Sequence, residues 1–474
     1  MFKANLTRIA DAPMPKSTRQ SVLFEGPFDK PVSVVFDAEA QTSDAGLLLL
    51  AAADKRLGLS SLLASQIRDS RQAGKVRHEL EELFRQRIFG IAAGYEDCND
   101  AARMGADPAL KLACGRGPVR GADLASQSTL CRFENKPTGR ETIAMLRSLE
   151  DAAVRGLKRR HRRAARIVID LDPSVDPAHG AQQGVLFNGF YDTWCYLPIF
   201  GFVSVAGDPE HHLFCARLRP GTAKEARGGI PTLRRMIGKL RDAFGRRQSI
   251  LVRLDAGFAR PGLLNALEEL GVKYVVGLPN NAKLNRWAKR RLPRVRRLAR
   301  ESGHAQREFH ERFYAARSWP HERRVILKAE ALPYSGRTMK SNPRFVVTNL
   351  RHKPERVYEI YCGRGDAENR IKELKCDLSI DRTSCSSFVA NQVRVAMTAA
   401  AYMLFQEIRW KLRKTKLQRA QVGRLRATLV KGSARVVESV RRIVFHLPTS
   451  YAFEQLWRRA AHALGATRSP PLVT

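Results

Sequence analysis

The sequence predicts an α/β protein, in which a mixed sheet with helices on both faces lies between helical regions at the two ends of the chain. Two observations lead to this fold class. Strand-like and helix-like segments follow one another in the order β-β-β-α-β-α-β over residues 167–279. Amphipathic patterns with the helical period fill much of residues 1–163. Strands that alternate with helices form a sheet that helices cover on both faces.

The helical region at the N-terminus, residues 1–163, is expected to bind DNA. Its apolar residues recur with a helical period through residues 46–69 and 75–100. The region leads into a basic run, VRGLKRRHRRAAR, at Val154–Arg166. This run predicts a helix or linker that faces DNA, and a solvated charged face is the alternative.

The first part of the core is expected at residues 164–280, where three strand-like segments follow one another in hairpin succession. Pro231 lies near the first turns of the helix that comes next. The segments are strands over 167–172, 184–207 and 211–221, a helix over 224–244, a strand over 249–259, a helix over 261–271 and a strand over 272–279.

The second half of the chain is expected to interrupt this core and then complete it. A β-rich insertion is predicted at residues 281–350, where a very basic segment precedes three strand-like segments. The core resumes over residues 351–408 with a helix that begins near Pro354 and contains YCGRGDAENRIKELK, Tyr361–Lys375. Residues 409–474 are predicted to form a basic helical region.

The charge of the chain indicates the class of its partner. The sequence has 83 Lys and Arg against 46 Asp and Glu, which leaves a formal net charge of +37. A charge this large predicts a polyanionic partner, and nucleic acid is the usual one. A basic ribosomal or nucleoid protein would carry a similar charge. Because 44% of the residues are hydrophobic, the chain is expected to be globular and not a basic tail.

The cysteines and the apolar segments indicate the compartment. None of the eight cysteines forms a CxxC pair, so a zinc site is not expected. The first residues lack the apolar segment of a signal peptide. The longest apolar run, Val395–Phe405, is too short to span a bilayer. We therefore expect a protein of the cytoplasm, associated with the nucleoid.

Two of the predicted strands end in carboxylates. Alternation along the first strand places Asp170 and Asp172 on the same face, so periodicity does not choose between them. Asp172 lies nearer the open end, because Pro173 cannot donate to a central ladder, and Asp170 is then expected to orient a ligand or a basic residue. Asp255 ends the second strand, and Glu368 is the third candidate acid.

Carboxylates that converge resist ionisation unless a cation neutralises them. Mg²⁺ meets this need, because it binds few carboxylates and completes its shell with water and phosphate oxygens. Two such ions, about 3.5–4 Å apart, activate the attacking oxygen and stabilise the leaving oxygen at a phosphodiester. The acids and the basic charge together therefore favour a metal-dependent reaction on DNA.

Four residues of the Tyr361–Lys375 segment share one face of the predicted helix. Tyr361, Arg364, Glu368 and Lys375 fall within roughly 60° of one another. An exposed helix with ordinary salt bridges between neighbouring turns is the alternative. The spacing Y-x2-R-x3-E-x6-K resembles the signature of DDE transposases from bacterial insertion sequences.

Five stretches of the sequence resemble the insertion sequence 1380 family in particular. They are GYEDCNDA, LASQSTLCRFEN, GFYDTWCYLP, RLDAGFA and YCGRGDAENRIKELK. The resemblance covers roughly Phe84 to Phe405. The chain departs from the family in AARMGADPALK, which lacks the usual leucine and arginine pair.

The resemblance implies a fold, a reaction and a set of roles. The catalytic core would be RNase H-like, and the chain would cut DNA at the ends of its element and join the freed 3′-OH to target DNA. It would work as a homodimer on double-stranded DNA with two Mg²⁺ or Mn²⁺ ions. The metal-binding and catalytic triad would be Asp172, Asp255 and Glu368, and the phosphate-binding residues Tyr361, Arg364 and Lys375.

Two alternatives to this function remain open at the level of sequence. One is a metal-dependent nuclease that does not transfer strands, and the other is a non-catalytic, basic DNA-binding protein. In the insertion, Trp287 or Trp319 is a candidate to stack on an unpaired base near the cut. A packed tryptophan is the alternative there.

Overall fold

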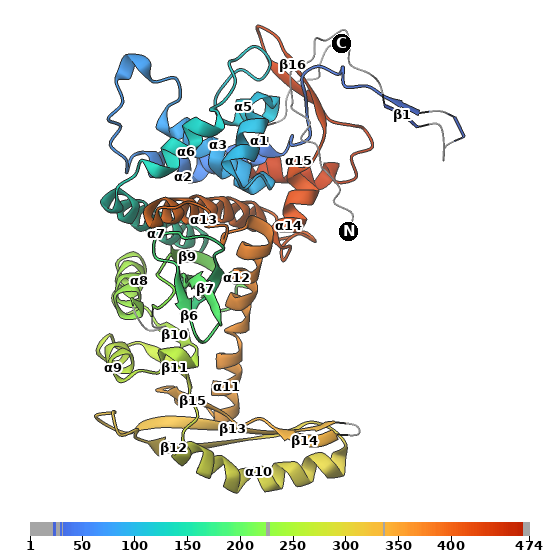
Figure 1. The fold of residues 1–474 in the computed structure, drawn as a ribbon. Helices are drawn as coiled ribbons and strands as arrows, with labels where there is room; N and C mark the ends of the chain where they lie inside the picture. The colour runs from blue at the N-terminus through green and yellow to red at the C-terminus, as the bar shows by residue number, and fades with distance from the viewer. Residues whose placement is uncertain (1–21, 25–28, 31, 224–227, 335–336, 468–474) are drawn as a thin grey trace, which may run out of the picture.

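The computed structural model describes residues 22–24, 29–30, 32–223, 228–334 and 337–467. At its centre is a nine-stranded sheet with the order β12-β13-β15-β11-β10-β4-β8-β9, and β14 pairs with β13. The N-terminal helices lie at one end of the molecule, and helix α10 lies at the other (Figure 1). The predicted α/β class with a mixed sheet and many helices is confirmed.

Five strands form the part of this sheet that holds the predicted acids. Strands β4, β10 and β11 are parallel to one another, and β8 and β9 form an antiparallel meander with β4. Because parallel strands end at the same edge of a sheet, the residues after β4 and β10 meet there. The strands are β4 (Ile167–Pro173), β8 (Ile199–Val205), β9 (His212–Arg217), β10 (Ile250–Leu254) and β11 (Lys273–Leu278).

A small second sheet follows β4 and replaces part of the predicted hairpin succession. Residues 174–198 leave the main sheet and form three short strands in the order β5-β7-β6 before the chain returns as β8. They are β5 (Asp176–Pro177), β6 (Leu186–Asn188) and β7 (Thr193–Tyr196). The stretch predicted as one strand over 184–207 therefore contains three.

The insertion begins with a helix that the sequence analysis did not predict. Its apolar residues recur at helical spacing and are buried, although cations surround them in the sequence. Strand β15 pairs with β11, and β13 pairs with β15, so the insertion extends the main sheet. Its elements are α10 (Ala282–Ser302), β12 (Gln306–Tyr314), β13 (Arg323–Tyr334), β14 (Arg337–Ser341) and β15 (Arg344–Thr348).

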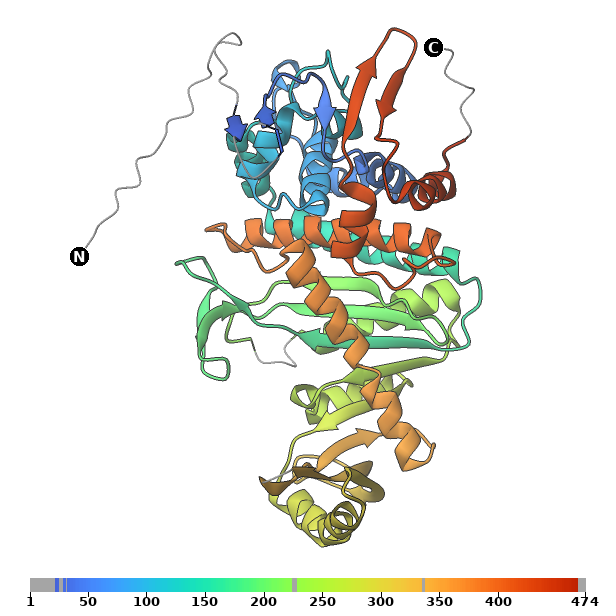
Figure 2. The same cartoon turned by 90° about the vertical axis from the view of Figure 1, so that its right-hand side faces the viewer.

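Helices cover the two faces of the sheet. Helices α8 (Gly229–Phe244) and α9 (Pro261–Glu269) lie on one face, and α11 and α12 run across the other (Figures 1 and 2). The single helix predicted from Pro354 is in fact two, α11 (Pro354–Cys362) and α12 (Gly365–Leu378). The break falls where glycine weakens a helix, so Tyr361 and Glu368 do not share one continuous helical face.

A layer of helices joins the sheet to the N-terminal region. The largely buried helix α13 (Phe388–Lys411) contacts α1, α3 and α7 as well as β9. The helices of the N-terminal region are α1 (Leu47–Leu57), α2 (Leu59–Ala64), η2 (Ala73–Lys75), α3 (Leu80–Ala93), α4 (Cys98–Arg103), η3 (Met104–Ala106), α5 (Pro108–Ala113), α6 (Gln127–Asn135) and α7 (Gly139–Arg160). Three short strands precede them, β1 (Val22–Phe24), β2 (Val32–Val34) and β3 (Gln41–Thr42).

The C-terminal region differs from the helical prediction, because a hairpin interrupts its helices. Strand β16 pairs with both β17 and β3, so it joins the C-terminal region to the segment that precedes α1. The elements are α14 (Val422–Leu425), a π-helical turn (Arg426–Val430), β16 (Ala434–Glu438), β17 (Ile443–His446) and α15 (Glu454–Leu464). Across the described ranges, no helix is both long and apolar enough to cross a membrane.

Candidate active site

The structure brings the three candidate acids to one edge of the sheet. Asp172 lies near the end of β4, and Asp255 directly follows β10, the parallel neighbour of β4. The Asp255 carboxylate accepts the backbone N–H of Gly257 at 3.1 Å and so caps the short helix η4 (Ala256–Phe258). Glu368 reaches the same edge from the first turn of α12.

Arg364 lies between two of these acids. Its Nη1 is 3.1 Å from Oδ2 of Asp172, and its Nη2 contacts Oε1 of Glu368. Its side chain is 16% exposed, whereas that of Glu368 is 52% exposed. Burial raises the pKa of Asp255, and the nearby charge of Arg364 limits that rise. The guanidinium is thus the cation that balances the acids in this structure.

Burial and mutual repulsion make the acids hard to ionise. Burial, together with the charges of Asp255 and Glu368, raises the pKa of Asp172 to about 7, although Arg364 opposes this rise. Burial also raises the pKa of Asp255. One guanidinium therefore does not neutralise the cluster fully. A set of oxygen donors that needs more positive charge suits a hard divalent cation.

Tyr361 joins this group, and Lys375 does not. Tyr361 lies in the last turn of α11 and interacts with Arg364 and Asp255, and burial raises the pKa of its phenol. Lys375 lies two turns beyond Glu368 on α12, where its Nζ contacts the carbonyl oxygen of Val175 and lies 3.7 Å from Asp381. Lys375 therefore borders the backbone that follows β4 and does not touch the acids.

Asp170 has a different environment from Asp172. It is 1% exposed, and both of its carboxylate oxygens accept N–H groups of Arg253 at 2.7 Å. His211 Nδ1 lies 3.7 Å away. The partner is a basic residue, as the sequence predicts for Asp170. Arg253 itself was not predicted, although an arginine within a buried strand signals a buried anionic partner.

The two tryptophans of the insertion are packed side chains. Trp287 and Trp319 are each 8% exposed. The Trp287 ring lies 6.0 Å from that of Phe345, and the Trp319 ring lies 5.6 Å from that of Tyr314. A ring that is enclosed in this way does not offer a face to a base. Both residues are therefore packed tryptophans, which was the alternative to stacking on an unpaired base.

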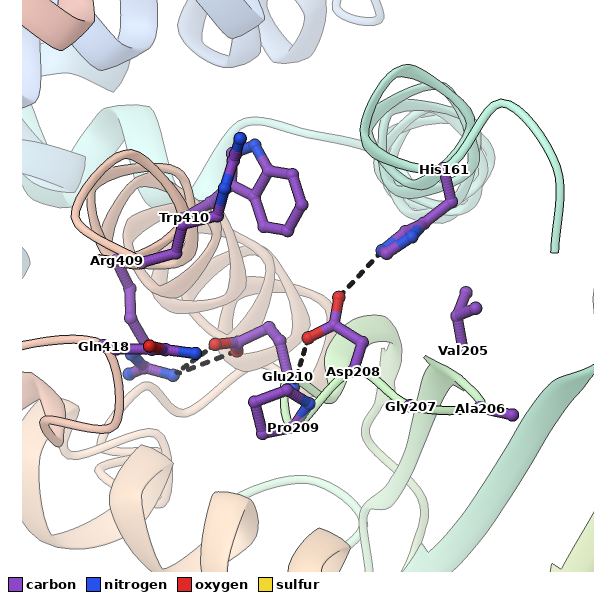
Figure 3. A pocket seen from close by; sticks show the side chains of 11 residues that line it. His161, Val205, Ala206, Gly207, Asp208, Pro209, Glu210, Arg409, Trp410 and Gln418 are labelled. Atoms are coloured by element: carbon purple, nitrogen blue, oxygen red, sulfur yellow. Dashed lines mark hydrogen bonds and ion pairs between the residues drawn. The ribbon is translucent and has the colours of Figure 1, made fainter. Parts of the chain in front are cut away.

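A second cluster of possible metal ligands lies at the opposite edge of the sheet. Among the described residues, the one set of three such side chains whose ligand atoms all lie within 4.8 Å of one another is His161, Asp208 and His212. His161 and Asp208 line a pocket of about 340 Å³ with Trp410 (Figure 3). This pocket includes Val205, which pairs with the first residue of β4, so it is remote from Asp172.

The charges around this second cluster disfavour a cation. His161 Nε2 lies 2.8 Å from Oδ2 of Asp208, and Arg160 Nη1 lies 2.7 Å from Nδ1 of His212. Burial and the charges of Arg160 and Arg409 hold the pKa of His212 well below its usual value. His161 is remote in sequence from Asp208 and His212, and the cluster was not predicted. We interpret the cluster as an ion-paired joint between α7 and the turn that connects β8 to β9.

Comparison with known proteins identifies the family. A search of curated proteins finds no match to the sequence. The family described as transposase DDE domain group 1 matches residues 24–469, which is nearly the whole chain. Transposases of this class use divalent metal ions, in agreement with the chemistry of the acid cluster. The chain therefore belongs to the DDE transposases, in the transposase DDE domain group 1 family.

Proposed function

We propose that this transposase binds the ends of an insertion sequence of the 1380 family, hydrolyses phosphodiester bonds there and joins the freed 3′-OH to target DNA. The observation that carries the proposal is the meeting of Asp172, Asp255 and Glu368 around Arg364 at one edge of the sheet. The strand order β9-β8-β4-β10-β11, an antiparallel meander beside parallel strands, supports an RNase H-like core.

The acids would hold two Mg²⁺ or Mn²⁺ ions. When bound, such a pair activates the attacking oxygen and stabilises the leaving oxygen of the phosphodiester. The chain contributes ionised carboxylates from three separate elements, so their spacing depends on how α12 sits on the sheet. The exposed side chain of Glu368 adjusts most readily, because its one ion pair within the described ranges is with Arg364.

The cations beside the acids would hold DNA phosphates. Arg364 offers a planar fork that matches phosphate oxygens, once Asp172 and Glu368 no longer occupy it. Tyr361 can donate its hydroxyl proton to a phosphate, because burial keeps the phenol protonated. Lys375 would add a point charge about 10 Å along α12 from Glu368. These contacts position the strand for cleavage and carry no sequence information.

The two ends of an element must be cut together, so we propose a homodimer on DNA. A nuclease that does not transfer strands would use the same acids, and strand joining is the observation that separates it from a transposase. Joined products between the element's end and a target duplex favour the transposase. A basic DNA-binding protein with purely structural acids would neither cut the DNA nor join strands.

The test is the substitution Glu368→Gln, which removes one metal-binding charge and keeps the size of the side chain. Cleavage of end-containing DNA in Mg²⁺ is expected to fall by more than the 10–100-fold that loss of an outer ligand partner costs. Affinity for the same DNA is expected to persist. Cleavage that survives in Glu368→Gln, or in excess chelator, contradicts the two-metal mechanism.

The matched control is Asp366→Asn in the same turn of α12. Its side chain is 65% exposed and faces His211 Nε2 at 3.7 Å, not Arg364. This control removes one negative charge near the site but no proposed metal ligand. It is expected to cleave at close to the wild-type rate. Equal loss in both variants would point to a general charge effect.

A further inference from the structure

Helix α10 carries an unusual concentration of positive charge. Its residues include one acid, Glu301. Nine of its cations are exposed to solvent: Lys283, Arg286, Lys289, Arg290, Arg291, Arg294, Arg296, Arg297 and Arg300. Such a helix repels itself unless an anion lies against it.

The cations of α10 are ordered into a stripe. Lys283, Arg286, Arg290, Arg294 and Arg297 follow one another at intervals of three or four residues, so they lie on one face of the helix. The opposite face is apolar and packs on β12 and β13; its buried residues are Leu284, Trp287, Ala288, Leu292, Val295 and Ala299. The stripe therefore points away from the protein.

Most of this charge has no acidic partner among the residues that the structure describes. Arg294 pairs with Glu308 at 3.0 Å, and Arg297 lies 3.8 Å from Glu301. In the part of the chain that the structure describes, Lys283, Arg286 and Arg290 form no ion pair. Three cations at the N-terminal end of the stripe are thus available to an external anion.

The basic run at Val154–Arg166, which the sequence analysis assigned to DNA, provides a contrast. Two of its arginines are used inside the protein: Arg159 and Arg160 lie 3.0 and 2.7 Å from the buried carboxylate of Glu407. A basic stretch in a sequence therefore does not by itself mark a DNA surface. The N-terminal part of the α10 stripe does so better, because Lys283, Arg286 and Arg290 are exposed and form no ion pair with the described residues.

We infer that the outer face of α10 docks the phosphate backbone of duplex DNA, independently of base sequence. This inference rests on the proposed function and names a DNA-binding surface for it. The helix has 21 residues, so it is about 30 Å long and spans about nine base pairs of duplex. Its single aromatic residue, Trp287, is buried. Binding of single strands relies on exposed aromatic rings, so the surface suits a duplex.

The surface has a fixed position relative to the acids. Strand β15 of the insertion pairs with β11 over four residues, and a Cβ added at Gly277 of β11 would lie 2.7 Å from the Tyr361 hydroxyl. The insertion and the acid cluster are thus joined through one continuous sheet. A duplex held on α10 would be anchored to the same sheet that carries Asp172 and Asp255.

The test compares the salt dependence of duplex binding by two matched triple variants. The first, Lys283→Gln, Arg286→Gln and Arg290→Gln, removes three free cations of the stripe. The control, Lys273→Gln, Arg246→Gln and Arg247→Gln, removes one lysine and two arginines. These exposed residues precede or begin β10 and β11, at the edge of the sheet opposite the acids.

The probe is a labelled duplex of about 20 base pairs of arbitrary sequence, titrated between about 50 and 200 mM salt. Each lost phosphate contact makes the slope of log K against log salt less steep by about 0.9. The first variant is expected to lose two to three such contacts, and Arg290→Gln alone about one. The control is expected to keep the wild-type slope.

Each outcome decides a separate point. A wild-type slope in the α10 variants, or an equal loss in the control, overturns the inference and leaves the proposed function standing. If the affinity of the wild-type protein for the duplex does not depend on salt, the result contradicts DNA binding itself and, with it, the proposed function. Glutamine favours helix, and the far-UV circular dichroism of each variant confirms that its fold is intact.

Discussion

Asp170 and Arg253 form a buried ion pair with two hydrogen bonds, each 2.7 Å long, between neighbouring strands of the sheet. Arg253 Nη1 also donates to the carbonyl oxygen of Ile360 at 3.2 Å, in the last turns of α11. Gly363, at the break between α11 and α12, lies against the same guanidinium. The pair therefore fixes the place where α12 begins, and with it the position of Glu368.

The first prediction separates Asp170 from Asp172. Asp170→Asn leaves the Arg253 charge buried without its counterion, so the free energy of unfolding should fall by about 3–5 kcal/mol. The folded fraction should still cleave DNA at raised Mg²⁺, at a cost of about 10–100-fold. Asp172→Asn should fold normally and not cleave. Urea unfolding and a cleavage assay across a Mg²⁺ titration check both variants.

The opposite pattern of cleavage would change the assignment. If Asp170→Asn is inactive at every Mg²⁺ concentration while Asp172→Asn still cuts, Asp170 is the first catalytic acid. The assay uses protein below its unfolding temperature, so loss of fold does not enter the comparison.

The second prediction concerns the two glycines at the helix break. A Cβ added at Gly363 would collide with Arg253 Nη1 and lie 3.4 Å from its Cζ, and that side chain is held by Asp170. Gly363→Ala should therefore shift α12 and lower the cleavage rate more than the DNA affinity. Gly365→Ala meets nothing within 4 Å and should stabilise the protein by about 0.4–1 kcal/mol. Wild-type cleavage by Gly363→Ala would show that Arg253 does not position α12.

The third prediction is a pH dependence in metal-free protein. The pKa of Asp172 is about 7 in the folded chain and about 4 in an unfolded one. Between these values the folded state binds more protons, so the free energy of unfolding falls as the pH rises from about 4 to 7. Asp172→Asn removes this penalty and should be more stable than wild type at pH 8, by about 4 kcal/mol at most.

Mg²⁺ provides the control for this prediction. It should raise the melting temperature of wild type at pH 8, because it stabilises the ionised acids, and should have little effect on Asp172→Asn. Thermal unfolding with chelator and with Mg²⁺ measures both effects. A variant that is less stable than wild type in chelator at pH 8 would contradict the raised pKa.

The central strands could be predicted because their signals are local. Alternation and β-branched residues mark β4 and β10, and parallel strands share an edge, so the approach of Asp172 to Asp255 follows from the sequence. Glu368 could be predicted only from the spacing of residues in the Tyr361–Lys375 segment, which resembles the family signature.

The remaining features depend on contacts between distant residues. Asp170 and Arg253 are 83 residues apart, and no periodic pattern links them. Helix α10 was missed because its few apolar residues are scattered among cations, and they make a helix only when β12 and β13 cover them. The break at Gly363 is likewise a tertiary effect, since the Arg253 side chain occupies the space that a Cβ would need.

The fourth prediction concerns a buried carboxylate that links three helices. Glu407 of α13 is 1% exposed in its side chain and pairs with Arg56 of α1 at 3.1 Å. Arg159 and Arg160 of α7 contact its other oxygen. Burial alone would raise the pKa of Glu407, but Arg160 and Arg159 outweigh it and hold the pKa below its usual value.

Glu407→Gln should lower the free energy of unfolding at pH 7 by about 3–5 kcal/mol, because three guanidinium groups lose their counterion. An acid with a lowered pKa stabilises the folded state above its unfolded pKa, and this contribution is lost as the pH falls through the folded pKa. The difference in the free energy of unfolding between wild type and Glu407→Gln should therefore stay constant from pH 8 to about 5 and shrink below about pH 4. Glu454→Gln, which breaks the exposed pair with Arg458, should change stability by less than about 1 kcal/mol. Denaturant unfolding of wild type and the two variants over this pH range measures this difference. A difference that grows as the pH falls would show that Glu407 is not ionised in the folded chain.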